Sequence, residues 1–114
     1  MNNEIEKLET ENAPETFDTF KIELRKPVEY DGKEYKVLEF DFGKLTGDDG
    51  LNIENELQSL GKFTMVPAFS GEYLIRMAAK ACTEKVGSDI FKKISLADYN
   101  RIRGAARSFL LRSE

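Results

Sequence analysis

The sequence predicts an α+β domain in which an N-terminal β-hairpin packs on about three α-helices and follows a flexible acidic arm. The first observation is that apolar and charged residues alternate between residues 20 and 42, a period typical of strands with one buried face. The second is that apolar residues recur at helical spacing in later segments, most densely at 70–86. The third is the length, since 114 residues predict a single domain with one core.

The register of the hairpin follows from the apolar pattern. A two-residue Asp-Gly loop would place Leu24 opposite Glu39, whereas a three-residue Tyr-Asp-Gly loop places it opposite an apolar residue. Because a shift by one residue turns a buried face toward water, we predict the three-residue loop, with Gly32 as a left-handed bulge. The predicted pairs are Leu24 with Leu38, Ile22 with Phe40 and Phe20 with Phe42.

Three helices are predicted after the hairpin. Thr46, with Asp49 three residues later, resembles a helix N-terminal box, and Gly61 can end that short helix. The segment from Ser70 to Val86 is apolar on more than one face, which is typical of a helix that other elements or a partner cover. The last helix is predicted to start after a cap at residue 95. Its apolar face comprises Leu96, Tyr99, Ile102, Ala106, Phe109 and Leu110.

Residues 1–19 are predicted to form the acidic arm, and residues 20–114 the single domain. Up to Thr19 the chain carries six acidic residues and one lysine, a net charge of −5. Few apolar side chains, among them Ile5 and Leu8, could pack, and a segment with so little apolar surface does not fold alone. The arm is therefore solvated, or it contacts a basic helix in the same or a neighbouring subunit.

The residue types do not favour catalysis, so we predict that the chain is not an enzyme and holds no cofactor or metal. Histidine, the commonest general base and metal ligand, is absent. Cys82 is the only cysteine and lies in an apolar segment, where burial raises the pKa of a thiol. The acidic residues Asp48 and Asp49 are adjacent, whereas a calcium loop alternates its ligands.

The sequence points instead to contacts with other proteins. Four arginines near the end of the chain could meet phosphates, but the chain has a net charge of −4 and no interleaved aromatic platform, so no nucleic-acid partner is predicted. No apolar run approaches the roughly 20 residues of a membrane span, so no membrane partner is predicted either. The apolar segment 62–69 is either buried or a contact site. The partner-binding candidates are Phe69, Tyr73, Ile75, Ala79, Arg103 and Arg107.

Three features, in this order and spacing, resemble a known family. They are the run from Leu24 to Tyr35 (LRKPVEYDGKEY), the break at Leu45-Thr46-Gly47-Asp48, and the ending that runs from Leu96-Ala97-Asp98-Tyr99 to Phe109-Leu110. Together they extend over roughly residues 20–111. The sequence resembles the small tail assembly chaperones of contractile and other long-tailed bacteriophages and prophages.

This resemblance implies a non-enzymatic role in virion assembly. Such chaperones bind the tape measure protein, a long, helical and apolar protein, and keep it soluble in the host cell cytoplasm until tail tube subunits polymerise around it. They are not expected in the mature particle. Self-association or a contact with the tail tube protein is a further partnership that this role allows. The alternative function is a structural subunit that is retained in a phage tail or tail-like particle.

Overall fold

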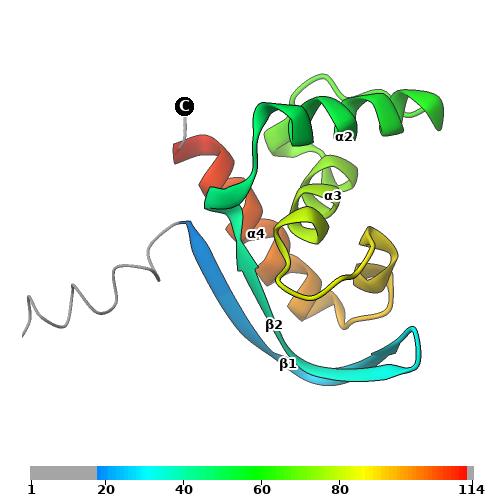
Figure 1. Cartoon of the computed structure of the whole chain (residues 1–114), viewed down its shortest axis with the longest axis vertical. Coiled ribbons are helices and arrows are strands. Elements are labelled where there is room, and N and C mark those ends of the chain that lie inside the picture. Colours follow the sequence, from blue (N-terminus) through cyan, green and yellow to red (C-terminus); the bar gives the residue numbers. More distant parts are fainter. Residues whose placement is uncertain (1–17, 113–114) are drawn as a thin grey trace, which may run out of the picture.

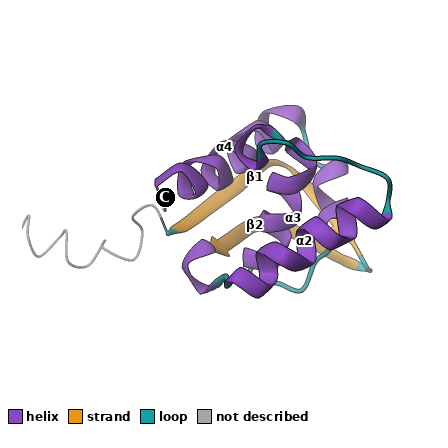
Figure 2. Cartoon of the chain, turned by 90° about the horizontal axis from the view of Figure 1, so that it is seen from above, coloured by secondary structure: helices purple, strands orange, loops and turns teal. Residues whose placement is uncertain are grey.

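The computed structural model describes residues 18–112, so the predicted arm lies almost wholly outside the described residues. As predicted, the fold is α+β, with an antiparallel hairpin followed by three α-helices (Figure 1). The central helix, α3, contacts β2 and all the other helical elements. Figure 2 shows α2 and α4 on opposite sides of α3. The elements are β1 (Thr19–Tyr30), β2 (Lys33–Asp41), η2 (Phe42–Lys44), α2 (Gly47–Ser59), η3 (Pro67–Phe69), α3 (Gly71–Ala81), η4 (Ser88–Lys92) and α4 (Leu96–Arg112), where η marks a 3-10 turn.

The hairpin turn has two residues and not the predicted three. Tyr30 is itself paired, with Lys33, so only Asp31 and Gly32 form the loop. Both loop residues have positive φ, 58° and 80°, as a type I′ turn requires. This turn is favoured because its twist matches the twist of the two strands. The prediction of a three-residue loop is therefore wrong.

The strands change register at an irregularity in β1. Glu23 pairs with Val37 and Val28 with Tyr35, so residues 24–27 of β1 lie opposite a single residue of β2. Strand β1 therefore has three more residues than β2 in this region. Because three is an odd number and side chains alternate between the two faces of a strand, this excess turns the other face of a strand inward. It therefore allows Ile22 and Leu24 to be buried on the same face as Leu38 and Phe40, whereas a regular ladder from this turn would place Leu24 opposite Glu39. The pairs found are Ile22 with Leu38 and Phe20 with Phe40, in place of the predicted Leu24 with Leu38, Ile22 with Phe40 and Phe20 with Phe42.

The first turn of α4 holds the irregular part of β1 in place. The backbone N–H of Arg25 donates to Oδ2 of Asp98 at 2.8 Å, and Asp98 is fully buried. The backbone N–H of Asp98 donates to Oγ of Ser95 at 3.1 Å, so Ser95 caps the helix as predicted. The carboxylate thus satisfies a strand N–H that the bulge has left without a ladder partner.

Helix α2 begins at the predicted N-terminal box. Asp49 N–H donates to Oγ1 of Thr46 at 3.3 Å, and Thr46 N–H donates to Oδ2 of Asp49 at 2.8 Å. The latter hydrogen bond lowers the pKa of the Asp49 carboxyl. The helix buries Ile53 and Leu57 and stops before Gly61, as predicted.

Helix α3 is shorter than predicted. It starts after its cap, Ser70, but ends well before Val86. Cys82 instead forms a bridge with Phe40, and the N–H of Thr83 donates to a β2 carbonyl at 2.9 Å. The open edge of β2 thus draws the chain out of the helix, which is why the prediction of a helix as far as Val86 is wrong.

The core lies between the hairpin, α3 and the inner face of α4. The ring of Phe42 stacks on Phe40 and on Phe109 of α4, with centroids 6.0 and 5.6 Å apart. On α4, Ile102 is buried as predicted, whereas Leu96, at the first helical position, is 71% exposed. The prediction that Leu96 belongs to the packed face is therefore wrong. Other side chains that are almost completely buried are Ile22, Leu38, Ile53, Leu74, Ile90 and Ala106.

Candidate partner-binding surface

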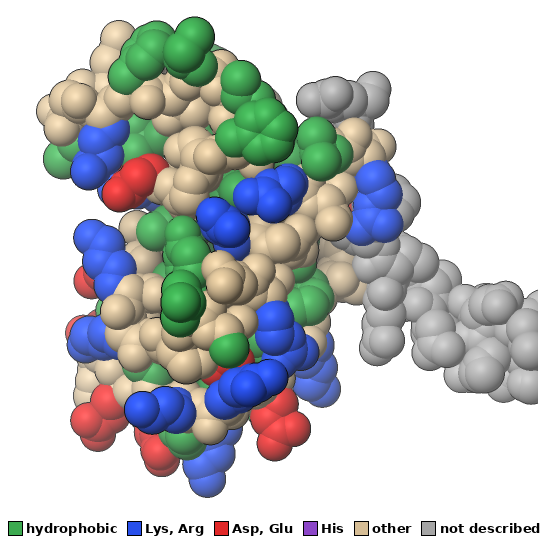
Figure 3. All heavy atoms as spheres, turned by 180° about the vertical axis from the view of Figure 1, so that it is seen from behind, with side chains coloured by type: hydrophobic (Ala, Val, Ile, Leu, Met, Phe, Trp, Pro, Cys, Tyr) green, Lys and Arg blue, Asp and Glu red, His purple; other side chains and the backbone are tan. Residues whose placement is uncertain are grey.

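Exposed apolar side chains gather in the segment between α2 and α3, residues 60–69, which we call the connector. Phe63, Met65 and Phe69 are 86%, 82% and 73% exposed, and Leu60 and Val66 are about half exposed. These five make up more than half of the nine large apolar residues exposed in the described part of the chain. Figure 3 shows hydrophobic side chains gathered at the end of the molecule formed by α2 and the connector. Single exposed apolar residues are ordinary, but a cluster marks a binding surface.

The backbone of the connector is anchored at both ends. Gly61 has a φ of 76°, and the N–H of Lys62 donates to the carbonyl of Leu57 at 2.8 Å, the Schellman ending of a helix. At the other end, Ala68 of η3 is buried. Between the connector and α2 lies a hollow of about 260 Å³, whose lining includes Leu57 and Phe63. The exposed side chains therefore project from a backbone with a defined course.

Three of the predicted residues come together where η3 meets α4. Nε of Arg107 donates to the carbonyl oxygen of Ala68 at 2.8 Å, which places this guanidinium beside Phe69. Arg103 lies one turn earlier on α4, with its guanidinium 5.7 Å from the centre of the Tyr99 ring. Within residues 18–112, neither arginine has a carboxylate at ion-pair distance. Phe69, Arg103 and Arg107 thus form one cationic and apolar surface, which we call the arginine–Phe69 surface.

The other three predicted residues do not join this surface. Tyr73 and Ile75 are only 7% and 5% exposed, because α2, α4 and the hairpin cover α3. Ile75, which the sequence predicted to bind a partner, is therefore part of the core. Ala79 is half-buried near the other end of α3, beside a small hollow that Arg76 and Val86 also line.

An ion-pair network fastens α2 and α3 together next to the connector. Arg76, 9% exposed, pairs with Glu72 one turn earlier and with Glu56 of α2, where Nε lies 3.2 Å from Oε2. Lys62 of the connector also pairs with Glu72, at 3.6 Å. The hydrogen bond from Arg76 lowers the pKa of the Glu72 carboxyl. The connector therefore begins next to two helices, α2 and α3, that ion pairs hold together.

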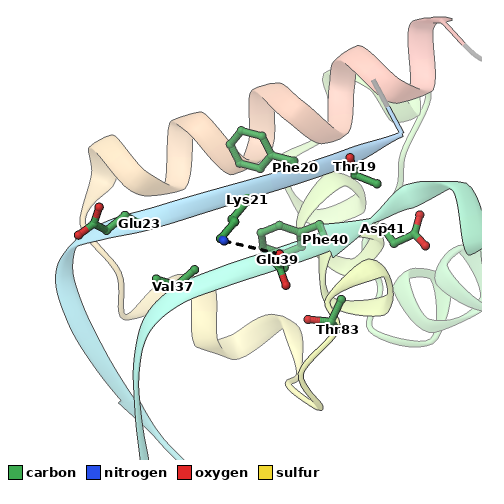
Figure 4. A pocket seen from close by; sticks show the side chains of 9 residues that line it. All are labelled: Thr19, Phe20, Lys21, Glu23, Val37, Glu39, Phe40, Asp41 and Thr83. Carbon is green, nitrogen blue, oxygen red and sulfur yellow. Dashed lines mark ion pairs between the residues drawn. The ribbon is translucent and has the colours of Figure 1, made fainter. Parts of the chain in front are cut away.

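A second hollow, of about 910 Å³, lies along the hairpin (Figure 4). Lys21 and Glu39, which both line it, form a 4.0 Å ion pair across the strands, and both side chains are more than half exposed. Exposed ion pairs of this kind contribute little to stability, and the hollow is lined by one lysine and three acidic residues. It presents no reactive arrangement of side chains.

Reactive groups do not gather elsewhere in the described part of the chain. Cys82 is buried, and burial raises the pKa of its thiol as predicted. No cluster of three or more side chains suited to a metal ion occurs within residues 18–112. No described helix is both long and apolar enough to cross a membrane.

Comparisons with known proteins give no match, whether with protein-family models, curated proteins or solved structures. The molecule is thus characterised by its own fold and surface: a small α+β domain with an exposed apolar connector beside two arginines that form no ion pair within residues 18–112.

Sequence reasoning selected Phe69 but passed over Leu60 and Phe63 as candidates. The available signal was the low polarity of residues 62–69, which left the choice between burial and contact open. The apolar residues of this segment do not recur at helical or strand spacing, and without such spacing they cannot all point toward one core. That absence of period, in a segment of this length, could have favoured exposure.

Proposed function

We propose that this chain is a tail assembly chaperone of a long-tailed phage or prophage. It binds the tape measure protein through the connector, keeps it soluble in the host cytoplasm and leaves before the tail is complete. The exposure of Phe63, Met65 and Phe69 within one short segment is the observation that supports this role. A protein that holds an apolar partner needs accessible apolar surface and no catalytic group. The identity of the partner comes from the sequence resemblance.

The size of the surface suits a reversible contact. Full burial of one large apolar side chain contributes about 1.5–3 kcal/mol, so three such residues contribute several kcal/mol. Association itself costs an estimated 4–15 kcal/mol. A single contact is therefore weak, and several copies along one long partner hold it by multivalency. Weak individual contacts also let the copies leave as tail tube subunits arrive.

The test is co-expression of the chain with its tape measure protein, followed by co-purification. The triple variant Phe63→Ser, Met65→Ser, Phe69→Ser is expected to lose the tape measure protein, which then aggregates. A matched control replaces three apolar residues that are exposed elsewhere, Val37, Leu51 and Leu96, by serine and should retain it. Circular dichroism is used to check that both variants are folded. Equal retention by the two folded variants would contradict a role for the connector.

Mass spectrometry of purified particles separates this proposal from its alternative. A chaperone is absent from finished particles, whereas a structural subunit is present in a fixed ratio to the tail tube protein. Finding the chain in washed particles at such a ratio would replace the chaperone proposal by the structural one.

A further inference from the structure

We infer that the acidic segment 4–15 of this chain docks on its own arginine–Phe69 surface. This contact involves no tape measure protein, so it stands or falls independently of the proposed function. Segment 4–15 lies outside the described residues, and the inference rests on three features of the chain. These are the position at which the segment joins the domain, the charges on α4, and the sequence of the segment itself.

The segment joins the domain next to α4. The carbonyl oxygen of Asp18 accepts a hydrogen bond from Phe42 N–H at 2.7 Å, and the Phe42 ring stacks on Phe109 of α4. Arg107 precedes Phe109 by two residues and lies on the opposite side of the helix, which is about 10–12 Å in diameter. Residues 4–11 lie between seven and fourteen positions before Asp18, roughly 23–46 Å of extended chain. The segment is therefore long enough to pass around α4 and reach both arginines.

The surface lacks the anionic partner that its charges require. Arg103 and Arg107 are four residues apart on α4, so two like charges face the same side and repel each other. Nε of Arg103 is buried and has no hydrogen-bond partner among the described residues. Buried donors are normally satisfied, and a guanidinium binds a carboxylate more strongly than a neutral acceptor. A carboxylate bound by the two guanidinium groups would neutralise these charges and relieve the repulsion.

The sequence of the segment complements this surface in charge and in polarity. Residues 1–17 carry five glutamates and one lysine, a net charge of −4. The two apolar residues Ile5 and Leu8 stand among Glu4, Glu6 and Glu9. Such a segment can place carboxylates on the arginines and an aliphatic side chain on Phe69, which is 73% exposed. Random acidic chain would offer only the first of these contacts.

Tethering makes a weak contact sufficient. A segment joined to its site by a short linker has an effective concentration in the millimolar range, so an intrinsic Kd of about 1 mM gives half occupancy. Salt screens exposed charges, with a Debye length of about 10 Å at 0.1 M and 3 Å at 1 M. Docking in the same chain should therefore weaken as salt is added and should not depend on protein concentration.

Paramagnetic broadening in the full chain tests the contact. A nitroxide is attached at Asn3→Cys on a Cys82→Ala background, and amide signals are compared before and after the label is reduced. We expect at least a twofold loss of intensity at residues 66–70 and 103–107. The variant Arg103→Glu/Arg107→Glu should recover full intensity. The matched control Lys92→Glu/Arg101→Glu makes the same change in charge at exposed positions and should remain broadened.

Several results would overturn the inference. One is broadening that persists in Arg103→Glu/Arg107→Glu, and another is recovery to the same extent in the control. A third is broadening seen when spin-labelled chain is mixed with isotope-labelled, nitroxide-free chain, because the segment would then dock on a second copy. If the arginine variant does not fold, Glu4→Lys/Glu6→Lys/Glu9→Lys replaces it, since these residues lie outside the described domain. Broadening unchanged in that variant also contradicts the inference.

Discussion

Helix α3 and the connector are adjacent segments that are similarly apolar, but α3 is buried and the connector is exposed. In α3, Leu74 and Ala78 are fully buried, whereas in the connector Phe63 and Met65 are more than 80% exposed. The difference lies in the spacing: helical periodicity gives α3 continuous faces that α2, α4 and β2 can cover. The connector has no such period, so its apolar side chains point outward from an anchored backbone. Apolar content alone thus does not distinguish core from binding surface.

The largest expected effect comes from placing a carboxylate in each segment. Ile75→Asp buries an unpaired charge in α3 and should lower the free energy of unfolding by at least about 3 kcal/mol. Phe63→Asp places the same group in water and should change it by no more than about 0.5 kcal/mol. Urea denaturation followed by circular dichroism measures both. Similar losses in the two variants would show that the connector is core.

A smaller effect is expected from the buried charge of α3. Arg76→Met removes the pairs with Glu56 and Glu72, which are half and two-fifths exposed. After allowance for solvent screening, the loss should be about 1–1.5 kcal/mol at pH 7. The corresponding Lys62→Met variant removes a more exposed partner from the connector and should cost less than about 0.5 kcal/mol.

The same pair of variants has a defined pH dependence. Because the pKa of Glu72 is lowered in the folded state, its contribution is present above its unfolded value and is lost as the pH falls through its folded value. The difference between the wild type and Arg76→Met should therefore shrink as the pH falls below the ordinary glutamate pKa of about 4.3. Urea titrations above and below this pH measure it. A difference that stays constant would mean that Arg76 acts through packing alone.

Much of the fold could be predicted because local chemistry decides it. Thr46 and Ser95 cap their helices as expected, and the inward face of the hairpin is the predicted one. The register was not predictable from alternation alone, since a regular ladder cannot represent three extra residues in β1. Pro27, which lies among those residues and cannot donate to a ladder, was the single local hint. Asp98 supports them from 73 residues away, a contact that local pattern does not reveal.

The candidate surface was only partly predictable, for a related reason. Phe69 and the two arginines carry exposed or half-exposed side chains, but Tyr73 and Ile75 are covered by elements distant in the sequence. Whether an apolar helix face is spare depends on how many neighbours reach it, and this is a tertiary property. Likewise, the end of α3 is set by the pairing of Cys82 with β2.

Alanine substitution should have opposite effects on stability at two glycines, one in the turn that begins the connector and one within α4. Gly61→Ala should cost about 1 kcal/mol, because a side chain is disfavoured at a φ of 76°. Gly104→Ala should instead stabilise by about 0.5 kcal/mol, since it lies within α4 and an added methyl group meets nothing within 4 Å. Thermal denaturation of the two variants gives the comparison. A loss in both would mean that substitution at either glycine disturbs packing.

The last prediction compares the reactivity of a thiol at the end of α3 with that of a thiol in the connector. This comparison measures how accessible each segment is in the folded protein. Cys82, at the end of α3, is buried, and burial raises the pKa of its thiol. In the folded protein at about pH 8, this thiol should therefore react with an aromatic disulfide reagent at least tenfold more slowly than in the protein unfolded by urea. Met65→Cys on a Cys82→Ala background places the only thiol on the connector, where reaction should approach the unfolded rate. Because the folded thiol holds its proton more tightly, its contribution to stability is complete below the unfolded thiol pKa of about 8.5 and is lost as the pH rises further. Equal reaction rates for the thiols of the two folded proteins would mean that the end of α3 is as accessible as the connector. The boundary between core and binding surface would then lie within α3.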